Sequence, residues 1–313
     1  MSRYILVRIV AAIPVLIGIS IVVFLLTSLI PGDVVTVMLG MMRSPQAEAS
    51  LRRLFGLDEP IYVRYLVWMG GVVQGNLGAS LRTGEPVFHA LMTRFPVTLE
   101  LTVLSLIIGL VVGIPSGIIA AVKQYSKADY LVSVLSLSGV CLPDFLVGTL
   151  LVLIFSLWLR VLPPTGYVSL QENPVQNLKL MILPAVTLGL GSAAVFMRMS
   201  RSAMLEVIHN DYMRTARAKG LSERVVLLVH GFRNALIPVV TVVGIDAGFL
   251  LSGVVVVETI FSLPGLGRLA LDSVAMRDYP MVQGVVLLVA TTFVLVNLVV
   301  DILYVYLDPR IRY

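Results

Sequence analysis

Several apolar runs in this chain are long enough to cross a lipid bilayer, and they constrain its fold more than any other feature. The first extends from Ile9 to Ile30, and a helix needs about 20 mostly apolar residues to span the hydrocarbon core. Backbone N–H and C=O groups find no water in lipid, so such runs are expected to be helical. The chain is 58% hydrophobic and 13% charged, with a mean hydropathy of +0.97. These values exclude an ordinary soluble domain.

We predict an all-α membrane protein with six transmembrane helices. They are expected at residues 9–30, 97–121, 131–159, 181–200, 236–257 and 281–307. The basic segment Met1–Arg8 resembles the start of a signal peptide, but the apolar run behind it is too long and no small-residue cleavage site follows. Residues 1–30 are therefore interpreted as an N-terminal helix that stays in the membrane.

The distribution of basic residues predicts the topology. If the N-terminus is inside, 13 of the 23 lysines and arginines fall in inner segments and four fall in the short outer loops. Because cytoplasmic loops carry an excess of these residues, both termini, including the tail at 308–313, are expected in the cytoplasm. The topology accounts for the net charge of +5, and nucleic acid is not an expected partner.

Residues 31–96 are expected to form a small extracytoplasmic subdomain between the first two spans. Ser44 and Pro45 are typical of the N-cap and first residue of a helix, which would stop near Gly56. A second helix is expected to start at Asp58–Pro60. Its shared face would consist of Tyr62, Tyr65, Leu66, Met69 and Val73. This helix could lie on the outer membrane surface, cover the mouth of a pathway or form a packed cap.

The chain lacks the common motifs of catalysis. Its three histidines, His89, His209 and His230, form no H-E-x-x-H zinc motif, and there is no G-x-S-x-G nucleophile elbow. No lysine follows a glycine, so a Walker A loop cannot form. The single cysteine, Cys141, cannot make an intrachain disulfide or a multi-cysteine metal site. We therefore expect no enzyme, catalytic residue, metal site or cofactor in this chain, and ATP-driven transport would need an ATPase in another chain.

The longest inner loop, residues 201–235, contains a strongly charged short segment, residues 211–220. Asp211 could cap a short helix there, and Gly220 could end it at the C′ position. One face of this helix would carry Arg214 and Arg217, and another Tyr212, Ala216 and Lys219. A second helix is expected to start at Ser222 and lie against the membrane base. Arginine forks suit carboxylates and carbonyls of a partner protein, whereas a basic helix could equally bind anionic lipid headgroups.

Two aspartates, Asp144 and Asp246, lie about halfway along the third and fifth predicted spans. A charged side chain at mid-membrane costs roughly 2.5–3.5 kcal/mol on insertion scales, so it usually faces a cavity or a partner. Both could line a translocation path and favour the ammonium group of a substrate. Alternatively, each could be a packed or water-lined residue, with the third helix kinked around Pro143.

Several motifs occur in an order that resembles one family. Residues 211–222 read Asp-Tyr-Met-Arg-Thr-Ala-Arg-Ala-Lys-Gly-Leu-Ser, and residues 230–241 read His-Gly-Phe-Arg-Asn-Ala-Leu-Ile-Pro-Val-Val-Thr. The further motifs are Leu29–Asp33, Gly56–Pro60, Gly75–Ser80, Glu258–Arg268 and Asp308–Arg312. Together they resemble the B-type permease subunits of peptide ABC importers, along nearly the whole chain. That family includes dipeptide, oligopeptide, glutathione and nickel systems.

The resemblance implies a type I ABC importer permease fold, with a core at 97–307, in a bacterial inner membrane. It also implies four kinds of partner: a second, C-type permease, two ABC ATPase subunits, an extracytoplasmic solute-binding protein and the lipid bilayer. ATP and Mg²⁺ would be used by the ATPases. The implied function is import of short peptides. A glutathione or nickel importer is an alternative within the family, and a stand-alone secondary transporter or channel is the alternative of another class.

The resemblance also assigns the two loops. The inner one corresponds to the EAA loop, whose coupling helix docks on the ATPase. The residues implied to couple are Tyr212, Arg214, Thr215, Ala216, Arg217, Lys219 and Gly220. Arg214 stands where the general motif has glutamate, so we expect a basic contact. In the outer loop, contact with the binding protein is expected at Glu258, Pro264, Gly265, Gly267 and Arg268, where the glycines would allow a close approach.

Overall fold

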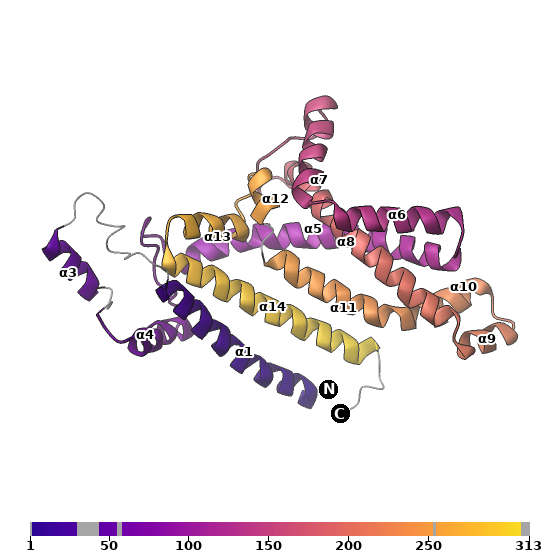
Figure 1. The fold of residues 1–313 in the computed structure, drawn as a ribbon, viewed down its shortest axis with the longest axis horizontal. Helices are drawn as coiled ribbons and strands as arrows, with labels where there is room; N and C mark the ends of the chain where they lie inside the picture. Colours follow the sequence, from indigo (N-terminus) through magenta and orange to yellow (C-terminus); the bar gives the residue numbers. More distant parts are fainter. Residues whose placement is uncertain (1, 30–43, 55–57, 253–254, 308–313) are drawn as a thin grey trace.

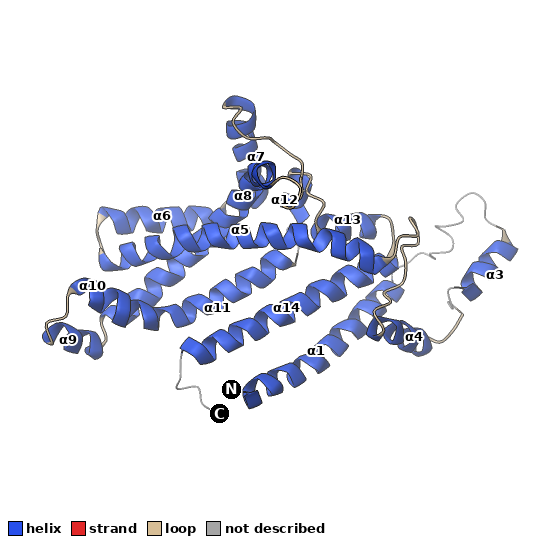
Figure 2. Cartoon of the chain, turned by 180° about the vertical axis from the view of Figure 1, so that it is seen from behind, coloured by secondary structure: helices blue, strands red, loops and turns tan. Residues whose placement is uncertain are grey.

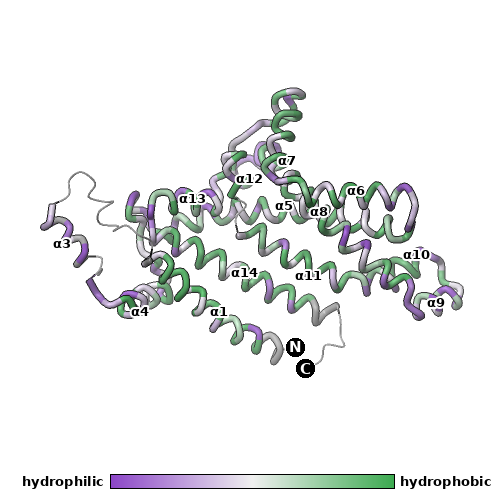
Figure 3. Tube along the Cα trace, in the orientation of Figure 1, coloured by the Kyte–Doolittle hydropathy of each residue, from purple (hydrophilic) through white to green (hydrophobic). Residues whose placement is uncertain are grey.

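The computed structural model describes residues 2–29, 44–54, 58–252 and 255–307, and every regular element in these ranges is a helix. The long helices lie side by side in an elongated bundle (Figure 1). They are mostly hydrophobic along their length, whereas α3 is mostly hydrophilic (Figure 3). Gly56 and residues 30–33 and 308–313, on which part of the predicted motifs fall, lie outside the described residues.

The first and last long helices form one side of the bundle. They are α1 (Ser2–Leu29) and α14 (Tyr279–Leu307), and they run antiparallel. The polar contacts that join them at opposite ends are Thr27–Gln283 at 2.7 Å and Arg8–Asp301 at 3.2 Å. Both termini therefore lie at the same end of the bundle.

The centre of the bundle is the pair α5 (Val87–Val122) and α8 (Pro174–Ile208). Three glycines of α5, spaced four residues apart, allow close contact: Gly109, Gly113 and Gly117. A Cβ atom added at Gly113 would lie 2.8 Å from the carbonyl oxygen of Ala193 on α8. Small residues at this spacing let membrane helices pack backbone to backbone. The successive glycines meet successively later residues of α8, so the two helices run parallel.

The parallel run of α5 and α8 means that the chain between them must return across the bundle. This connection consists of α6 (Lys127–Cys141), α7 (Asp144–Leu151) and the π-helical η2 (Val152–Trp158). Among the described residues, five helices are long and apolar enough to span a membrane, and the bent α6–η2 pair makes a sixth when it is counted as one broken span. The prediction of six spans is thus confirmed. The third is not one continuous helix over 131–159, because it bends by 103° at Pro143.

Several other boundaries differ from the prediction. The fourth span is longer at both ends, at 174–208 rather than 181–200, and the fifth ends at Leu251 rather than at 257. The second span begins at Val87, ten residues before the predicted start, and Pro96 lies inside the helix. The buried residues Val87 and Leu91 pack against α14 there. The stabilisation from this packing outweighs the helix hydrogen bond that is lost because Pro96 has no N–H. The helix expected to start at Ser222 does so, but it continues as a π-helical turn and then as α11 (Phe232–Leu251), so it forms one span with the fifth helix.

Short helices lie toward the two ends of the bundle, and α3 stands apart from the long helices (Figure 1). At one end are α3 (Pro45–Leu54), α4 (Ile61–Val73), α12 (Val255–Ile260) and α13 (Leu266–Ala275). At the other is α9 (Asp211–Ala218) (Figure 2). The predicted starts of α3 at Pro45 and of α4 behind Pro60 are confirmed.

Candidate functional site

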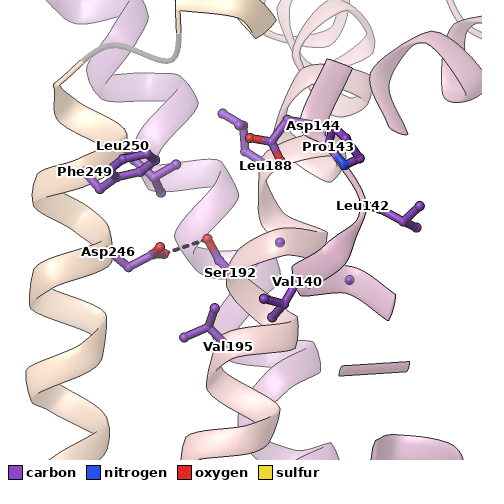
Figure 4. A pocket seen from close by; sticks show the side chains of 12 residues that line it. Val140, Leu142, Pro143, Asp144, Leu188, Ser192, Val195, Asp246, Phe249 and Leu250 are labelled. Atoms are coloured by element: carbon purple, nitrogen blue, oxygen red, sulfur yellow. Dashed lines mark hydrogen bonds between the residues drawn. The ribbon is translucent and has the colours of Figure 1, made fainter. Parts of the chain in front are cut away.

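A cavity of about 300 Å³ lies where the bend between α6 and α7 meets α8 and α11. Its lining residues come from α6, α7 and the bend between them, and from the more distant α8 and α11. They are Gly139, Val140, Leu142, Pro143, Asp144, Leu188, Gly191, Ser192, Val195, Asp246, Phe249 and Leu250. Both aspartates that the sequence marked as membrane-embedded therefore lie on one cavity (Figure 4).

The proline at the bend positions Asp144. Pro143 has extended backbone angles, φ −65° and ψ 138°, and ends the preceding helix while starting α7. Asp144 is consequently the first residue of α7, where the free N–H groups and the helix dipole favour a negative charge. Its carboxylate lies near Gly191 of α8. The kink expected at Pro143 is present, and it is what turns this side chain toward the cavity.

Asp246 enters the cavity from the opposite wall. Its Oδ2 accepts a hydrogen bond of 2.6 Å from Ser192 Oγ on α8. Both carboxylates are half-buried, and none of the 12 lining residues is basic. The cavity therefore offers hydrogen-bond acceptors and negative charge within apolar walls, an arrangement suited to an ammonium group.

The coupling segment lies at the end of the bundle that holds both termini. Met213 and Ala216 of α9 are buried, at 0% and 7% exposure, in a cluster with residues of α5, α8 and α11. The expectation that Ala216 faces a partner is not met, because the helix uses its small residues to pack on its own chain. Met213, which the sequence did not single out, is the residue that anchors the helix.

The ends of this short helix agree with prediction at one position. Gly220 has φ +79°, and its N–H donates to Arg217 O at 2.9 Å, as expected for a C′ glycine. Asp211 is different: Asn210 is the N-cap, no side chain caps the helix, and Asp211 is the first helical residue.

Some polar side chains of α9 bind other residues of the chain, and others are exposed to solvent. Arg217 makes a forked contact with Glu223, with Nη2 to Oε1 at 2.9 Å. The Tyr212 hydroxyl accepts a hydrogen bond of 3.0 Å from Asn234. Arg214 is 79% exposed and makes a 3.7 Å contact with Asp211, which is 96% exposed, an arrangement worth little in water. Thr215 and Lys219 are also exposed.

A buried ion pair near the same end was not predicted. Asp129 of α6 accepts two hydrogen bonds from Arg201 of α8, from Nε at 2.6 Å and Nη2 at 3.0 Å, and one from the Tyr125 N–H at 2.9 Å. It fixes the N-terminal end of α6 against α8. The two residues are 72 positions apart, so no local pattern reveals the pair.

The outer loop is built around Glu258, which is 0% exposed. Its carboxylate accepts hydrogen bonds from Thr98 Oγ1 at 2.7 Å and from the Arg268 N–H at 2.9 Å. A Cβ atom at Gly265 would collide with this carboxyl group, and one at Gly267 would lie 3.1 Å from its Oε2.

The predicted contacts with a binding protein are therefore only partly accessible. Glu258, Gly265 and Gly267 are buried, and the glycines approach the chain's own carboxylate. Pro264 is half-buried, and the Arg268 side chain is 42% exposed. Burial raises the pKa of Glu258 above its ordinary value, while the hydrogen bonds from Thr98, Arg268 and Gly267 act in the opposite direction.

Across the described ranges, no group of three or more His, Cys, Asp or Glu side chains could hold a metal ion. The candidate functional features of these ranges are one acidic cavity between the spans and one helical surface at each end.

Comparison with known proteins gives consistent matches. Residues 113–313 match the family described as binding-protein-dependent transport system inner membrane component, and residues 1–102 match its N-terminal region. The chain is 45% identical to the di/tripeptide transport system permease protein DppB of Pseudomonas aeruginosa, over 96% of both chains. It is 44% identical to the dipeptide permease DppB of Escherichia coli K12, over 100% of this chain and 99% of that one. It is 43% identical to the glutathione permease GsiC of the same strain, over the whole of both.

A solved structure is similar in fold. The inward-facing MetNI methionine ABC transporter superimposes with a TM-score of 0.54 at 17% identity, over 70% of this chain and 96% of the compared chain. This match confirms the predicted type I importer permease fold.

Proposed function

Because the chain belongs to the binding-protein-dependent transport system inner membrane components, we propose that it is one permease subunit of an ABC importer that passes short peptides into the cytoplasm. The chain is a multi-pass inner-membrane protein. The observation that carries the proposal is the full-length similarity to di/tripeptide and glutathione permeases. The acidic cavity between its spans supports it. Glutathione, which also carries a free ammonium group, is the second candidate.

The proposal includes the partners and the orientation. A second permease subunit, two ATPases that bind ATP and Mg²⁺, and an extracytoplasmic binding protein complete the importer. Both termini and α9 face the cytoplasm. Reconstituted vesicles should accumulate labelled dipeptide only when ATP, both permeases, both ATPases and the binding protein are present. Uptake by this subunit alone would instead support a stand-alone transporter or channel. Uptake of glutathione but not of dipeptides would identify glutathione as the substrate.

We assign substrate contact to the cavity of Asp144 and Asp246. Their carboxylates would attract the N-terminal ammonium group as a peptide passes between the spans. The double variant Asp144→Asn/Asp246→Asn should lower uptake of a free dipeptide more than uptake of its N-acetylated form. Ser192→Ala, which keeps both carboxylates, is the matched control. Equal uptake of the free peptide by wild type and double variant would refute this role.

We assign ATPase coupling to the exposed side of α9, formed by Tyr212, Arg214, Thr215 and Lys219. Arg214 is the basic contact best placed for a partner carboxylate, since its local partner Asp211 is almost fully exposed. Arg214→Glu should leave basal ATP hydrolysis in place and reduce its stimulation by substrate-loaded binding protein. Unchanged stimulation would refute the assignment.

Arg217 can be tested separately because its partner is known. Arg217→Glu places two negative charges together at Glu223, so it should disorder the loop and weaken coupling. The swap Arg217→Glu/Glu223→Arg restores an ion pair inside the chain. If Arg217 only holds the loop, the swap recovers coupling; if it also binds the ATPase, coupling stays low.

For the binding protein we propose the outward side of α13 in addition to Arg268. Leu271, Val274 and Met276 are about half exposed there, and charged residues border them, as at the rim of a protein interface. Val274→Asp should weaken stimulation of ATP hydrolysis by the binding protein without changing basal hydrolysis. An unaltered response to binding-protein concentration would argue against this surface.

A further inference from the structure

The short helix α4 (Ile61–Val73) carries an uncovered apolar face that the importer function does not explain. Its only charged residue is Arg64. Four of its large side chains are about two-thirds exposed or more: Tyr62 at 66%, Leu66 at 65%, Val67 at 72% and Val73 at 80%. A helix on a water-facing surface normally exposes charged and polar residues, so this face is expected to have a partner.

The opposite face of α4 packs against the first transmembrane helix, α1. The Tyr65 hydroxyl and Ser20 Oγ share a hydrogen bond of 2.8 Å. The rings of Tyr65 and Trp68 pack against Phe24, with centroid distances of 5.5 and 5.6 Å. The Arg64 guanidinium lies 6.0 Å from the centre of the Phe24 ring. The predicted shared face of Tyr62, Tyr65, Leu66, Met69 and Val73 is thus split: Tyr65 faces α1, whereas Tyr62, Leu66 and Val73 face outward.

The height of this contact along α1 places α4 within the bilayer. The apolar span of α1 is Leu6–Ser28, and Ile17 is its middle residue. From Ile17 to Phe24 the helix rises about 10 Å at 1.5 Å per residue, whereas half the hydrocarbon core is about 15 Å thick. Ser20 lies deeper still. A helix packed on these two residues lies beside acyl chains rather than above the headgroups.

The length and ends of α4 agree with a helix that enters one leaflet only. Thirteen residues extend about 20 Å, too short for a core of about 30 Å. Polar residues flank both ends, with Asp58 and Glu59 before the helix and Gln74 and Asn76 after it. At the same height α1 also exposes apolar side chains, and Val22 is 54% exposed.

We propose that α4 is an interfacial helix embedded in the outer leaflet, and that its outward face binds phospholipid acyl chains. It anchors the extracytoplasmic segment to the membrane and braces the outer half of α1. The assignment to the outer leaflet rests on the proposed importer orientation, in which α9 is cytoplasmic. The burial of α4 in lipid, by contrast, does not depend on the transported substrate.

Fluorophore quenching tests the proposal in the complete reconstituted complex. In a background with Cys141→Ser and no accessible cysteine in the other subunits, Val67→Cys is labelled with an environment-sensitive dye. Val22→Cys on α1 is the lipid-facing control, and Arg82→Cys in the exposed segment between α4 and α5 is the water-facing control. The Val67 label should lose emission with doxyl-labelled phosphatidylcholine as the Val22 label does, and should resist aqueous iodide. Quenching by iodide, or by neither reagent, would overturn the proposal, since the face would then meet water or protein.

A second site covers the case in which Val67→Cys does not assemble. Leu66→Cys in intact spheroplasts should react with a membrane-impermeant maleimide much more slowly than Arg82→Cys does. Equal reaction rates would overturn the proposal. ATP-dependent peptide uptake is measured on the same preparations, so loss of the lipid contact and failure of the importer assignment give different results.

Discussion

Glu258 links three segments at the end of the bundle opposite α9, and its replacement gives a quantitative prediction. The buried carboxylate holds the Thr98 hydroxyl and the N–H groups of Arg268 and Gly267. In Glu258→Ala both backbone donors lose their acceptor. One orphaned buried donor costs about 1–3 kcal/mol and the void adds to this, so we expect a loss of about 3–5 kcal/mol in stability.

Glu258→Gln should cost much less. The amide can turn its oxygen toward the two backbone N–H groups and its NH₂ group toward Thr98 Oγ1. That oxygen already accepts from the Leu266 N–H at 2.9 Å, and a hydroxyl has a second lone pair to offer. The hydrogen bonds of the protonated carboxyl group are then replaced by those of a neutral amide, which costs about 1–2 kcal/mol.

The pH dependence follows from the raised pKa of Glu258. Its ordinary value is 4.5, and burial raises it in the folded protein. The folded state then binds this proton more tightly than the unfolded chain does. The contribution of Glu258 to the free energy of unfolding is therefore fully present below pH 4.5. It is lost as pH rises through the pKa of Glu258 in the folded protein. Glutamine has no such proton, so the stability advantage of wild type over Glu258→Gln should shrink as pH rises through this window.

The first assay is the thermal unfolding midpoint of the detergent-solubilised complex, measured from about pH 4 upward. This starting pH lies about half a unit below the ordinary carboxyl pKa. The second assay is the rate of tryptic cleavage after Arg268. Thr98→Ser keeps the hydroxyl and serves as the control. Two results would refute the reasoning: an alanine variant as stable as wild type, or a difference between wild type and glutamine variant that does not change with pH.

Three further predictions concern packing and loop geometry. Gly113→Leu should force α5 from α8 and abolish a stable complex on size-exclusion chromatography, whereas the neighbouring Val112→Leu, on the exposed side, should not. Asp129→Asn should lower stability by about 1–3 kcal/mol, and the double variant with Arg201→Gln should recover part of it; additive losses in a thermal cycle would contradict a direct pair. Gly220→Ala should cost about 1–2 kcal/mol because φ is positive there, and proteolysis in the inner loop should rise; an unchanged cleavage rate would count against it.

The sequence could predict features that depend on local pattern. Apolar runs revealed the spans because each must satisfy its own backbone groups in lipid. Pro45, Pro60 and Gly220 marked helix ends because their backbone restrictions are local. The spacing of Gly109, Gly113 and Gly117 was a further readable signal, typical of close helix packing, that our prediction did not use.

Other errors arose where tertiary packing overrode a local rule. Pro96 was expected to precede a helix but lies within one, because the turns before it pack on neighbouring helices. Ala216 was assigned to a partner surface although its own chain buries it. A helical face can be read from spacing, but which neighbour covers that face cannot.

By itself, the sequence determined a six-span helical membrane protein without an ATP-binding loop, and the resemblance of its inner loop to the coupling loop of peptide importers. Only the tertiary structure brought Asp144 and Asp246 to one cavity and buried Glu258 beneath its loop. It alone set α4 against Ser20 and Phe24. The physical reason is the distance along the chain over which each effect acts. Hydrophobicity and backbone preferences act along a few turns of one segment. The environment of a polar side chain, by contrast, depends on which distant helices pack around it.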